Sequence, residues 1–268
     1  MADSSNPEKI KQAKCFLLDM DGTIYLSDRL LPGAADLIAF LAEKGLRYYF
    51  LTNNSSRSKQ DYVDKLNGLG LEVSPGQVFT SGEATAIYLD RHHPGVRLYL
   101  VGTPSLMDEY TRHGFILVED APDAVVLGFD TTLTYEKIRR LCRFIVEGKP
   151  YIATHPDINC PTEDGFIPDI GAVMALVEAS TGRLPDVIVG KPNQPMVEAV
   201  LEKTGLSAGE IVMVGDRLYT DIAMSQAGIT TVLVLSGETR LEEVSLSPFT
   251  PDLIVKDVGE LLEMLREA

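Results

Sequence analysis

Four short apolar runs are each followed at once by a polar motif, and this arrangement limits the possible folds more than any other feature. The runs cover residues 16–18, 48–51, 187–189 and 211–214. Amphipathic helical patterns such as 34–43 lie between apolar runs. Strands that alternate with helices predict a parallel sheet covered by helices. Because ligand sites in such sheets lie beyond the carboxyl ends of the strands, the four motifs are candidates for one shared site.

The first motif is Asp19-Met20-Asp21-Gly22-Thr23. Residues two apart in an extended chain point the same way, so Asp19 and Asp21 can face one pocket. Two such carboxylates repel and require a cation, and oxygen-only ligands favour a hard ion such as Mg²⁺. A turn with solvated acids is the alternative. The strand directly before the motif favours a functional site.

The second motif, Gly-Asp-Arg-Leu-Tyr-Thr-Asp at residues 215–221, follows the run 211–214. Asp216 is expected to be a metal ligand, and a turn acid is the weaker alternative. Asp221 falls near the start of a helix predicted from about residue 219, where a carboxylate accepts backbone hydrogen bonds. A pure helix cap is therefore a serious alternative for Asp221.

The third motif is Thr52-Asn53-Asn54-Ser55-Ser56, after the run 48–51. Its hydroxyls, amides and backbone N–H groups can hold phosphate oxygens without adding charge. A loop that caps the next helix is the alternative, since Ser58 and Asp61 resemble a capping box.

The fourth motif, Gly190-Lys191-Pro192, supplies a local positive charge. The chain has 39 acidic and 24 basic residues and a formal net charge of −15. Such a chain repels nucleic acid and anionic membranes, so neither is an expected partner. An anionic substrate then requires positive charge within the site, and Lys191 at a strand end meets that need. An exposed lysine is the alternative.

Length and composition indicate a globular protein of one large or two modest domains. Of its 268 residues, 45% are apolar and 24% charged. Its cysteines, Cys15, Cys142 and Cys160, form neither a disulfide framework nor a zinc motif. No secretory signal and no run of about 20 apolar residues is present. A cytoplasmic location is the expectation.

The middle of the chain repeats the strand–helix alternation. Residues 97–101, 124–127 and 151–153 predict strands, and a helix capped by Thr134 separates the last two. Turn residues at 81–82 and 181–185 bracket a segment of about a hundred residues, a plausible domain size.

The four motifs, in this order, resemble those of the haloacid dehalogenase (HAD) superfamily of phosphohydrolases. DMDGTIY, TNNS, GKP and GDRLYTD resemble more narrowly its NagD-like or 4-nitrophenylphosphatase branch, subclass IIA. The resemblance covers essentially the whole chain. It implies a Rossmann-like α/β core with a parallel sheet at residues 1–81 and 185–268, and an inserted α/β cap at 82–184.

The resemblance implies a chemical role for each motif. Asp19 is the nucleophile that forms an aspartyl-phosphate, and Asp21 protonates the leaving oxygen and then assists the attacking water. Asp21 also binds Mg²⁺ through its backbone carbonyl, and Asp221 orients metal-bound water. The implied metal ligands are Asp19, Asp21, Asp216 and Asp221. The implied phosphate-binding residues are Thr52, Asn53, Asn54 and Lys191.

Residues 154–161, Thr-His-Pro-Asp-Ile-Asn-Cys-Pro, are dense in turn and polar residues. By resemblance they belong to the substrate-specificity loop of the cap. Its candidates to contact the leaving group are His155, Asp157, Asn159 and Cys160. An ordinary surface loop is an equal alternative. The resemblance also implies that caps in this branch can pair subunits into a homodimer.

The leading functional hypothesis is a phosphomonoesterase for small esters, such as nucleoside monophosphates, sugar phosphates or 4-nitrophenyl phosphate. A phosphotransferase or mutase with the same intermediate is the second. By the same resemblance, mutases of the superfamily usually have a smaller helical cap, and the long strand-rich insert here weighs against them. A phosphate-ligand binding protein without chemistry is the third, and it would lack Asp19 or Asp21. Asp21 also argues against a dehalogenase, because halide needs no acid to leave.

Overall fold

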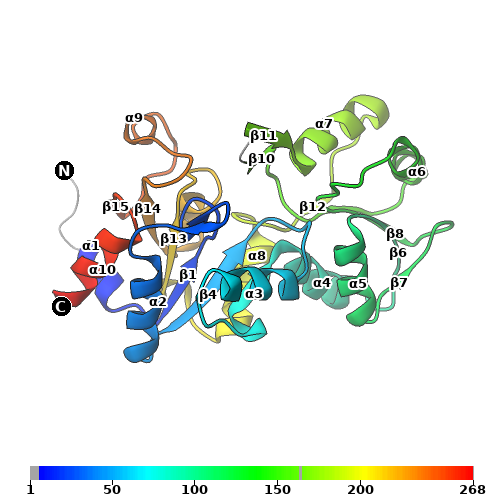
Figure 1. Ribbon diagram of the computed structural model, residues 1–268. Coiled ribbons are helices and arrows are strands. Elements are labelled where there is room, and N and C mark those ends of the chain that lie inside the picture. The colour runs from blue at the N-terminus through cyan, green and yellow to red at the C-terminus, as the bar shows by residue number, and fades with distance from the viewer. Residues whose placement is uncertain (1–5, 163–164, 268) are drawn as a thin grey trace. The chain divides into compact units, whose positions relative to one another are not determined.

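The computed structural model describes residues 6–162 and 165–267. The chain folds into two compact units. Unit 1 consists of Met1–Thr52, Val63–Phe79 and Val200–Ala268, and unit 2 of Asn53–Tyr62 and Thr80–Ala199. Each unit is built on its own sheet, with helices packed around it (Figure 1).

Unit 1 contains a six-stranded sheet in the order β15-β14-β13-β1-β4-β5. Its strands are β1 (Cys15–Leu18), β4 (Arg47–Thr52), β5 (Val78–Thr80), β13 (Ile211–Gly215), β14 (Thr230–Val234) and β15 (Leu253–Val255). The pairs from β15 to β4 are parallel. Leu18 on β1 lies opposite Val214 on one side and Phe50 on the other. β1 is buried along its whole length, as a central parallel strand requires.

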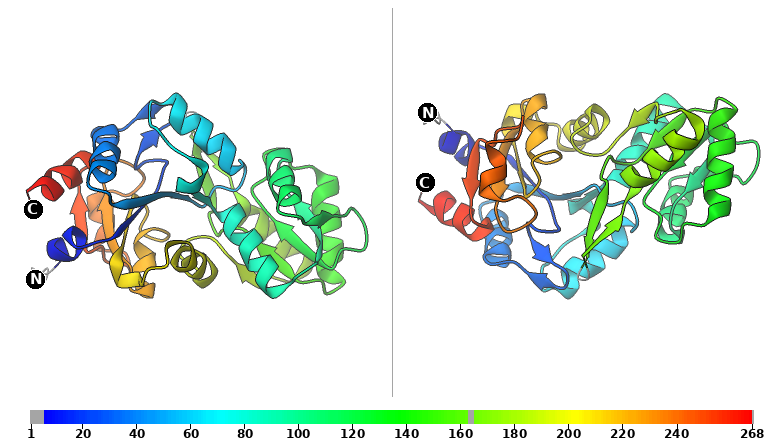
Figure 2. Two further views of the ribbon diagram at one scale, coloured as in Figure 1. Left: turned by 90° about the horizontal axis from the view of Figure 1, so that it is seen from below. Right: turned by 90° about the horizontal axis from the view of Figure 1, so that it is seen from above.

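Several helices belong to unit 1, and two cross between the units. They are α1 (Asn6–Lys11), α2 (Ala34–Glu43), α3 (Lys59–Gly68), α8 (Gln194–Thr204), α9 (Leu241–Val244) and α10 (Val258–Arg266). Helices α2 and α10 pack against each other (Figure 2), and α3 and α8 cross from one unit to the other. Short 3₁₀ helices are η1 (Pro75–Gln77), η2 (Ala208–Glu210) and η3 (Ile222–Ala227), and β2 (Tyr25–Leu26) pairs with β3 (Arg29–Leu30).

Two local predictions near helix starts can be compared with the structure. The capping box is confirmed, because Ser58 N donates to Asp61 Oδ2 at 2.8 Å and Asp61 N donates to Ser58 Oγ at 3.3 Å. The helix predicted from about residue 219 is present, but it starts later and is a 3₁₀ helix. Residues 218–221 form turns, and η3 begins only at Ile222.

Unit 2 contains a five-stranded parallel sheet in the order β12-β9-β8-β6-β7. Its strands are β6 (Arg97–Val101), β7 (Ile116–Leu117), β8 (Ala124–Leu127), β9 (Tyr151–Ala153) and β12 (Val187–Ile188). Its helices are α4 (Ser81–His92), α5 (Pro104–Arg112), α6 (Tyr135–Val146) and α7 (Ile170–Thr181), and β10 (Asn159–Thr162) pairs with β11 (Gly165–Pro168) as a hairpin. Thr134 accepts a hydrogen bond from Lys137 N and caps α6 as predicted.

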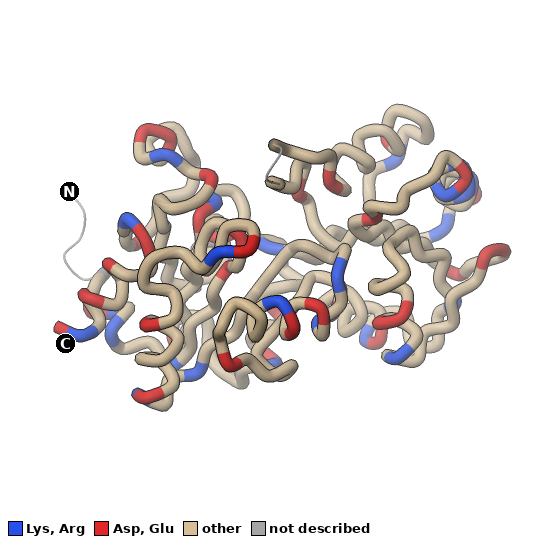
Figure 3. Tube along the Cα trace, in the orientation of Figure 1, with Lys and Arg blue, Asp and Glu red and all other residues tan. Residues whose placement is uncertain are grey.

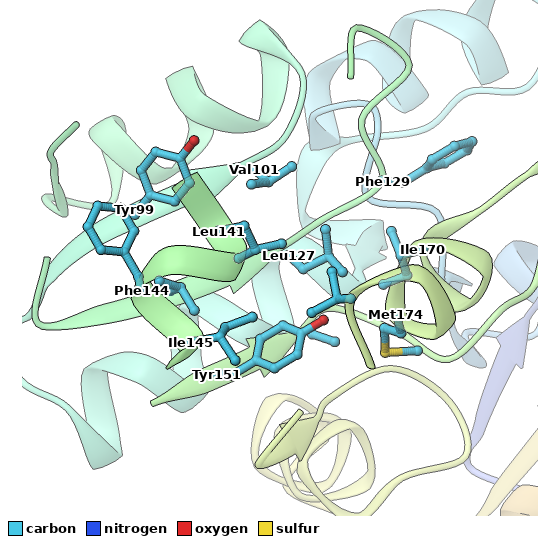
Figure 4. Close-up of a cluster of buried hydrophobic side chains, with 13 residues drawn as sticks. Tyr99, Val101, Leu127, Phe129, Leu141, Phe144, Ile145, Tyr151, Ile170 and Met174 are labelled. Atoms are coloured by element: carbon cyan, nitrogen blue, oxygen red, sulfur yellow. The ribbon is translucent and has the colours of Figure 1, made fainter. Parts of the chain in front are cut away.

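The core of unit 2 lies between this sheet and the pair α6 and α7 (Figure 4). Leu141, Phe144 and Ile145 of α6 are buried, and the rings of Tyr99 and Phe144 meet with centroids 5.1 Å apart. Burial of each large apolar side chain contributes roughly 1.5–3 kcal/mol. This core holds the strand ends that carry Thr154, His155 and Lys191.

Charged residues of both signs are spread along both units (Figure 3). On α6, Glu136 pairs with Arg139 and with Arg140. Within the described ranges, no helix combines the length and the apolar character that crossing a membrane would need.

Candidate active site

Three carboxylates meet at the carboxyl ends of β1 and β13 in unit 1. Asp19 follows β1, and its backbone N–H donates to Val214 O at 2.9 Å. Asp216 follows β13, and the chain then turns back through residues 218–221 to Asp221. One carboxylate oxygen from each of Asp19, Asp216 and Asp221 lies within 4.8 Å of the others. The adjacent parallel strands therefore bring two distant motifs to one place, as their sequence context predicts.

Glycines make room for these carboxylates. A Cβ atom at Gly22 would lie 2.5 Å from Asp216 Oδ2, and one at Gly237 would lie 2.0 Å from the same atom. A Cβ atom at Gly215 would lie 2.3 Å from Asp221 Cγ. Gly22 also has a φ of +83°, which other residues rarely adopt. Side chains at these positions would displace the acids.

Asp216 is buried in an environment that disfavours its charge. Its Oδ2 accepts a hydrogen bond from Glu238 N at 2.7 Å. Its Oδ1 is buried and has no hydrogen-bond partner in the described part of the chain. Burial and then the negative charge of Asp221 raise the pKa of Asp216 to about 7, while Arg217 opposes the rise. A buried acid with an unpartnered oxygen beside two other acids is suited to holding a cation.

The donor set fits a divalent cation that prefers oxygen ligands. All three side chains present carboxylates, and Asp216 Oδ1 has no competing hydrogen bond among the described residues. Asp221 directly precedes η3, but its side chain accepts no capping hydrogen bond from the first turn of that helix. Instead Asp221 Oδ2 accepts from Arg217 N at 3.1 Å. The alternative of a pure helix cap for Asp221 is therefore wrong.

Asp21 lies on the same loop, but its side chain is outside the group of three carboxylates. It is half-buried, and Tyr25 Oη donates to Asp21 Oδ2 at 3.2 Å. The loop closes on the same tyrosine, because Gly22 N donates to Tyr25 O at 2.8 Å. The Asp21 carboxylate is therefore not one of the three that meet within 4.8 Å. The predicted binding through its backbone carbonyl stays a prediction.

In unit 2, Asn53 and Lys191 are joined by two hydrogen bonds. Lys191 N donates to Asn53 Oδ1 at 2.7 Å, and Asn53 Nδ2 donates to Lys191 O at 3.1 Å. Asn53 Nδ2 also donates to Asp157 Oδ1 at 2.9 Å. Lys191 is only 2% exposed, so the alternative of an exposed lysine is wrong.

The neighbours of Asn53 are placed differently. Thr52 is the buried last residue of β4. Asn54 is half-buried; its Oδ1 accepts from Ser56 N at 2.9 Å and its Nδ2 lies 3.8 Å from Cys160 Sγ. The third motif therefore continues from the end of a unit 1 strand into the loop that begins unit 2.

The candidates at residues 155–160 divide into buried and exposed pairs. His155 and Asp157 are buried, which contradicts the surface-loop alternative for these two. Asn159 is exposed and Cys160 is half-buried, both on β10. The histidine lies 2.9 Å from Asp169 through its Nε2, a partner that sequence reasoning missed.

Sequence reasoning also missed the residues after β14. Ser236 Oγ donates to Gly22 O at 2.8 Å, and Gly237 and Glu238 enclose Asp216. A signal was available, because these polar residues directly follow a further apolar run, as in the four motifs.

The chain is similar to known hydrolases over most of its length. The family model described as haloacid dehalogenase-like hydrolase matches residues 16–116, and a second, described as HAD-hydrolase-like, matches residues 188–261. An acid sugar phosphatase of Staphylococcus aureus is 35% identical over 260 residues, 96% of this chain and 100% of that protein.

Two solved structures are similar over nearly their whole length. The 4-nitrophenylphosphatase of Thermotoga maritima is 48% identical with a TM-score of 0.92, covering 95% of this chain and 98% of that one. NagD from E. coli K-12 is 35% identical with a TM-score of 0.85, covering 92% and 98%.

The chain belongs to the haloacid dehalogenase-like hydrolases, with the mixed α/β fold and parallel sheets of that family. Within the family it belongs to the NagD-like branch, and it is a HAD-type phosphatase.

Proposed function

We propose that this enzyme is a Mg²⁺-dependent phosphomonoesterase that acts through an aspartyl-phosphate on small phosphate esters. The observation that carries the proposal is the meeting of Asp19 with buried Asp216 and Asp221 within 4.8 Å. The half-buried Asp19 is the accessible member of this group. An acid of this kind can attack phosphorus while the buried acids hold a cation.

The proposed reaction has two steps. A carboxylate oxygen of Asp19 attacks phosphorus as the bond to the leaving oxygen breaks, and Asp21 donates a proton to that oxygen. Asp21 then takes a proton from a water that attacks the aspartyl-phosphate, which releases phosphate and restores Asp19. Bound Mg²⁺, held by Asp19, Asp216, Asp221 and the Asp21 carbonyl, would supply positive charge that offsets anion repulsion.

Thr52, Asn53, Asn54 and Lys191 are proposed to hold the transferring phosphoryl group. The burial of Lys191, which is only 2% exposed, supports this role, because a cation attracts an anion more strongly in a buried site than in water. Backbone N–H groups of the loop around Asn53 are suited to phosphate oxygens. The side-chain amide of Asn53 already donates to Asp157 Oδ1 and Lys191 O.

Residues 82–184 are proposed as the inserted cap and residues 1–81 and 185–268 as the core. Relatives named as acid sugar phosphatase and 4-nitrophenylphosphatase support sugar phosphates and 4-nitrophenyl phosphate as substrates. Nucleoside monophosphates, a cytoplasmic location and a homodimer through the cap stay predictions from the sequence.

Phosphate release from 4-nitrophenyl phosphate and from a panel of sugar phosphates and nucleotides tests the proposal. Turnover is expected with Mg²⁺ and none after chelation. Asp19→Asn should abolish turnover, whereas Asp28→Asn, which changes an exposed acid of the same unit, should not. Substantial activity in Asp19→Asn would overturn the mechanism. Faster phosphoryl transfer to an added acceptor than to water would favour the phosphotransferase alternative.

A further inference from the structure

We propose that His155 and Asp169 form a buried positioning pair that holds Asn53 and Lys191 in place for phosphoryl binding. This inference rests on the proposed function, because it assigns a task to residues that hold the phosphoryl group. It replaces the expectation that His155 contacts the leaving group.

The pair is isolated from solvent. His155 is 0% exposed and Asp169 3% exposed. His155 Nε2 lies 2.9 Å from Asp169 Oδ1, and the same oxygen accepts from Ile170 N at 2.6 Å at the start of α7. The carboxylate is therefore fixed by a helix start and in turn fixes the imidazole ring.

A continuous chain of hydrogen bonds orients the ring from its other side. Phe129 N donates to Ser55 Oγ at 2.9 Å. Ser55 Oγ lies 2.8 Å from Thr154 Oγ1, and Thr154 Oγ1 lies 3.0 Å from His155 Nδ1. An imidazole that donates from Nε2 to Asp169 and accepts at Nδ1 satisfies this chain. Thr154 Oγ1 then donates to His155 Nδ1 and accepts from Ser55 Oγ, which in turn accepts from Phe129 N.

The same chain reaches Asn53 from two directions. Ser55 lies two residues beyond Asn53 on the same loop, and Ser81 Oγ donates to Asn53 O. Ser81 Oγ also lies 3.5 Å from His155 Nδ1. A shift of the imidazole ring would therefore disturb two hydroxyls that hold residues 53–55, those of Ser81 and Ser55.

Gly190 links the histidine to Lys191 by direct packing. Gly190 N donates to Thr154 O at 2.8 Å. A Cβ atom at Gly190 would lie 2.5 Å from His155 Cβ and 2.6 Å from Asn53 Oδ1. The strand ends of β9 and β12 are thus pressed together, so that the backbone of Lys191 meets the Asn53 amide.

These contacts favour a positioning role for His155 over metal binding or contact with the leaving group. His155, Asp157 and Asp169 offer atoms within 4.8 Å of one another, which is also compatible with a metal ion. However, the ring nitrogens already meet Asp169 and Thr154, and Asp157 Oδ1 accepts from Asn53. The ring has no nitrogen left for a leaving group or a metal.

The test compares His155→Phe, Asp169→Ala and Asp169→Asn with the wild-type enzyme. Phenylalanine keeps the ring and removes both nitrogens, and asparagine keeps an oxygen acceptor for Nε2–H and Ile170 N. The matched control is Asp130→Ala, which removes another buried carboxylate of unit 2, paired with Lys137 at 2.6 Å. Thermal unfolding of each variant identifies those that stay folded.

Two readouts separate this inference from the proposed function. Calorimetry with inorganic phosphate and Mg²⁺ measures binding without turnover, and kcat/KM is measured for 4-nitrophenyl phosphate and a sugar phosphate. His155→Phe and Asp169→Ala should weaken phosphate binding about tenfold or more and lower kcat/KM for both esters by the same factor, on the order of 10–100-fold. Asp169→Asn and Asp130→Ala should resemble the wild-type enzyme.

Several results would overturn the inference. One is unchanged phosphate binding in His155→Phe, and another is a fall in kcat/KM for only one of the two esters. The others are an equal fall in phosphate binding and kcat/KM in Asp130→Ala, and one metal ion per chain bound at His155, Asp157 and Asp169. If the wild-type protein binds phosphate but releases none from esters, the proposed function fails while the binding comparison still decides the inference. If the wild-type protein binds no phosphate, both fail.

Discussion

Replacing Asp216 by asparagine should stabilise the metal-free protein and remove its response to Mg²⁺. The asparagine oxygen can still accept the hydrogen bond from Glu238 N. The change removes a buried negative charge whose Oδ1 has no hydrogen-bond partner in the described ranges. This negative charge is also the one that would hold a bound cation.

The structure sets the size of the effect. Two unit charges at the upper limit of 4.8 Å repel by roughly 3.5 kcal/mol at an effective dielectric of ~20, and closer charges repel more. Asp216 faces two such neighbours, Asp19 and Asp221. Because partial protonation relieves some of this repulsion, we expect Asp216→Asn to raise the metal-free unfolding free energy by about 1–3 kcal/mol at about pH 8.

The gain should depend on pH. Burial and the charge of Asp221 raise the pKa of Asp216 from 3.8 to about 7. A raised folded-state pKa means that the folded state keeps its proton longer than the unfolded state. Metal-free stability is then lost as pH rises through about 7. The advantage of Asp216→Asn should therefore be small below about pH 3.8, grow as pH rises from there, and be complete above about 7.

Thermal unfolding across pH, with and without Mg²⁺, measures both effects. Wild-type protein should gain roughly 2.7 kcal/mol when Mg²⁺ is at a hundredfold excess over its Kd. Asp216→Asn should gain little and should lose phosphatase activity, whereas Asp28→Asn should behave as wild type. Equal stabilisation of wild type and Asp216→Asn by Mg²⁺, or a metal-free variant less stable than wild type at alkaline pH, would refute the reasoning.

Three further predictions concern other parts of the chain. Burial raises the pKa of Glu109 to about 7, so Glu109→Gln should gain stability relative to wild type as pH rises toward that value, measured by thermal unfolding at several pH values. Gly237→Ala places a Cβ atom 2.0 Å from Asp216 Oδ2, and the displaced carboxylate should weaken Mg²⁺ binding about 10–100-fold, measured by calorimetry. Tyr25→Phe removes the hydrogen bond to Asp21, so kcat should fall more for alkyl phosphates, which need a proton donor, than for 4-nitrophenyl phosphate.

Each of these predictions has its own control. Parallel pH curves for Glu109→Gln and wild type would contradict the first. Gly209→Ala, at a glycine with nothing within 4 Å of a built Cβ atom, should leave Mg²⁺ binding unchanged. Tyr99→Phe removes another buried tyrosine hydroxyl, which donates to Lys137 O at 3.2 Å, and should not alter the ratio of the two substrates.

Strands were the most predictable elements of the fold. The apolar runs at residues 97–101, 124–127 and 151–153 coincide with β6, β8 and β9. Such runs are buried on both faces, so hydrophobicity alone marks them. The helix predicted from about residue 219 begins only at Ile222, as the 3₁₀ helix η3. The chain there must fold back so that Asp221 reaches Gly215 and Asp19, and tertiary contacts outweigh helix propensity.

The sequence by itself determined the family and the chemical character of the site. Local patterns were sufficient for this. They were an acid pair after a buried strand, a lysine at another strand end, and two further acids after a third strand. They needed no coordinates, because strand ends in parallel sheets are where functional side chains gather.

Only the tertiary structure decided which side chains share an environment. It buried His155 against Asp169, enclosed Asp216 with Gly237, and joined Asn53 to Lys191 across more than a hundred residues of chain. Hydrogen bonds and steric exclusion act between atoms a few ångströms apart, whatever their separation in sequence. Such pairings depend on the order and register of the strands, which local patterns do not contain.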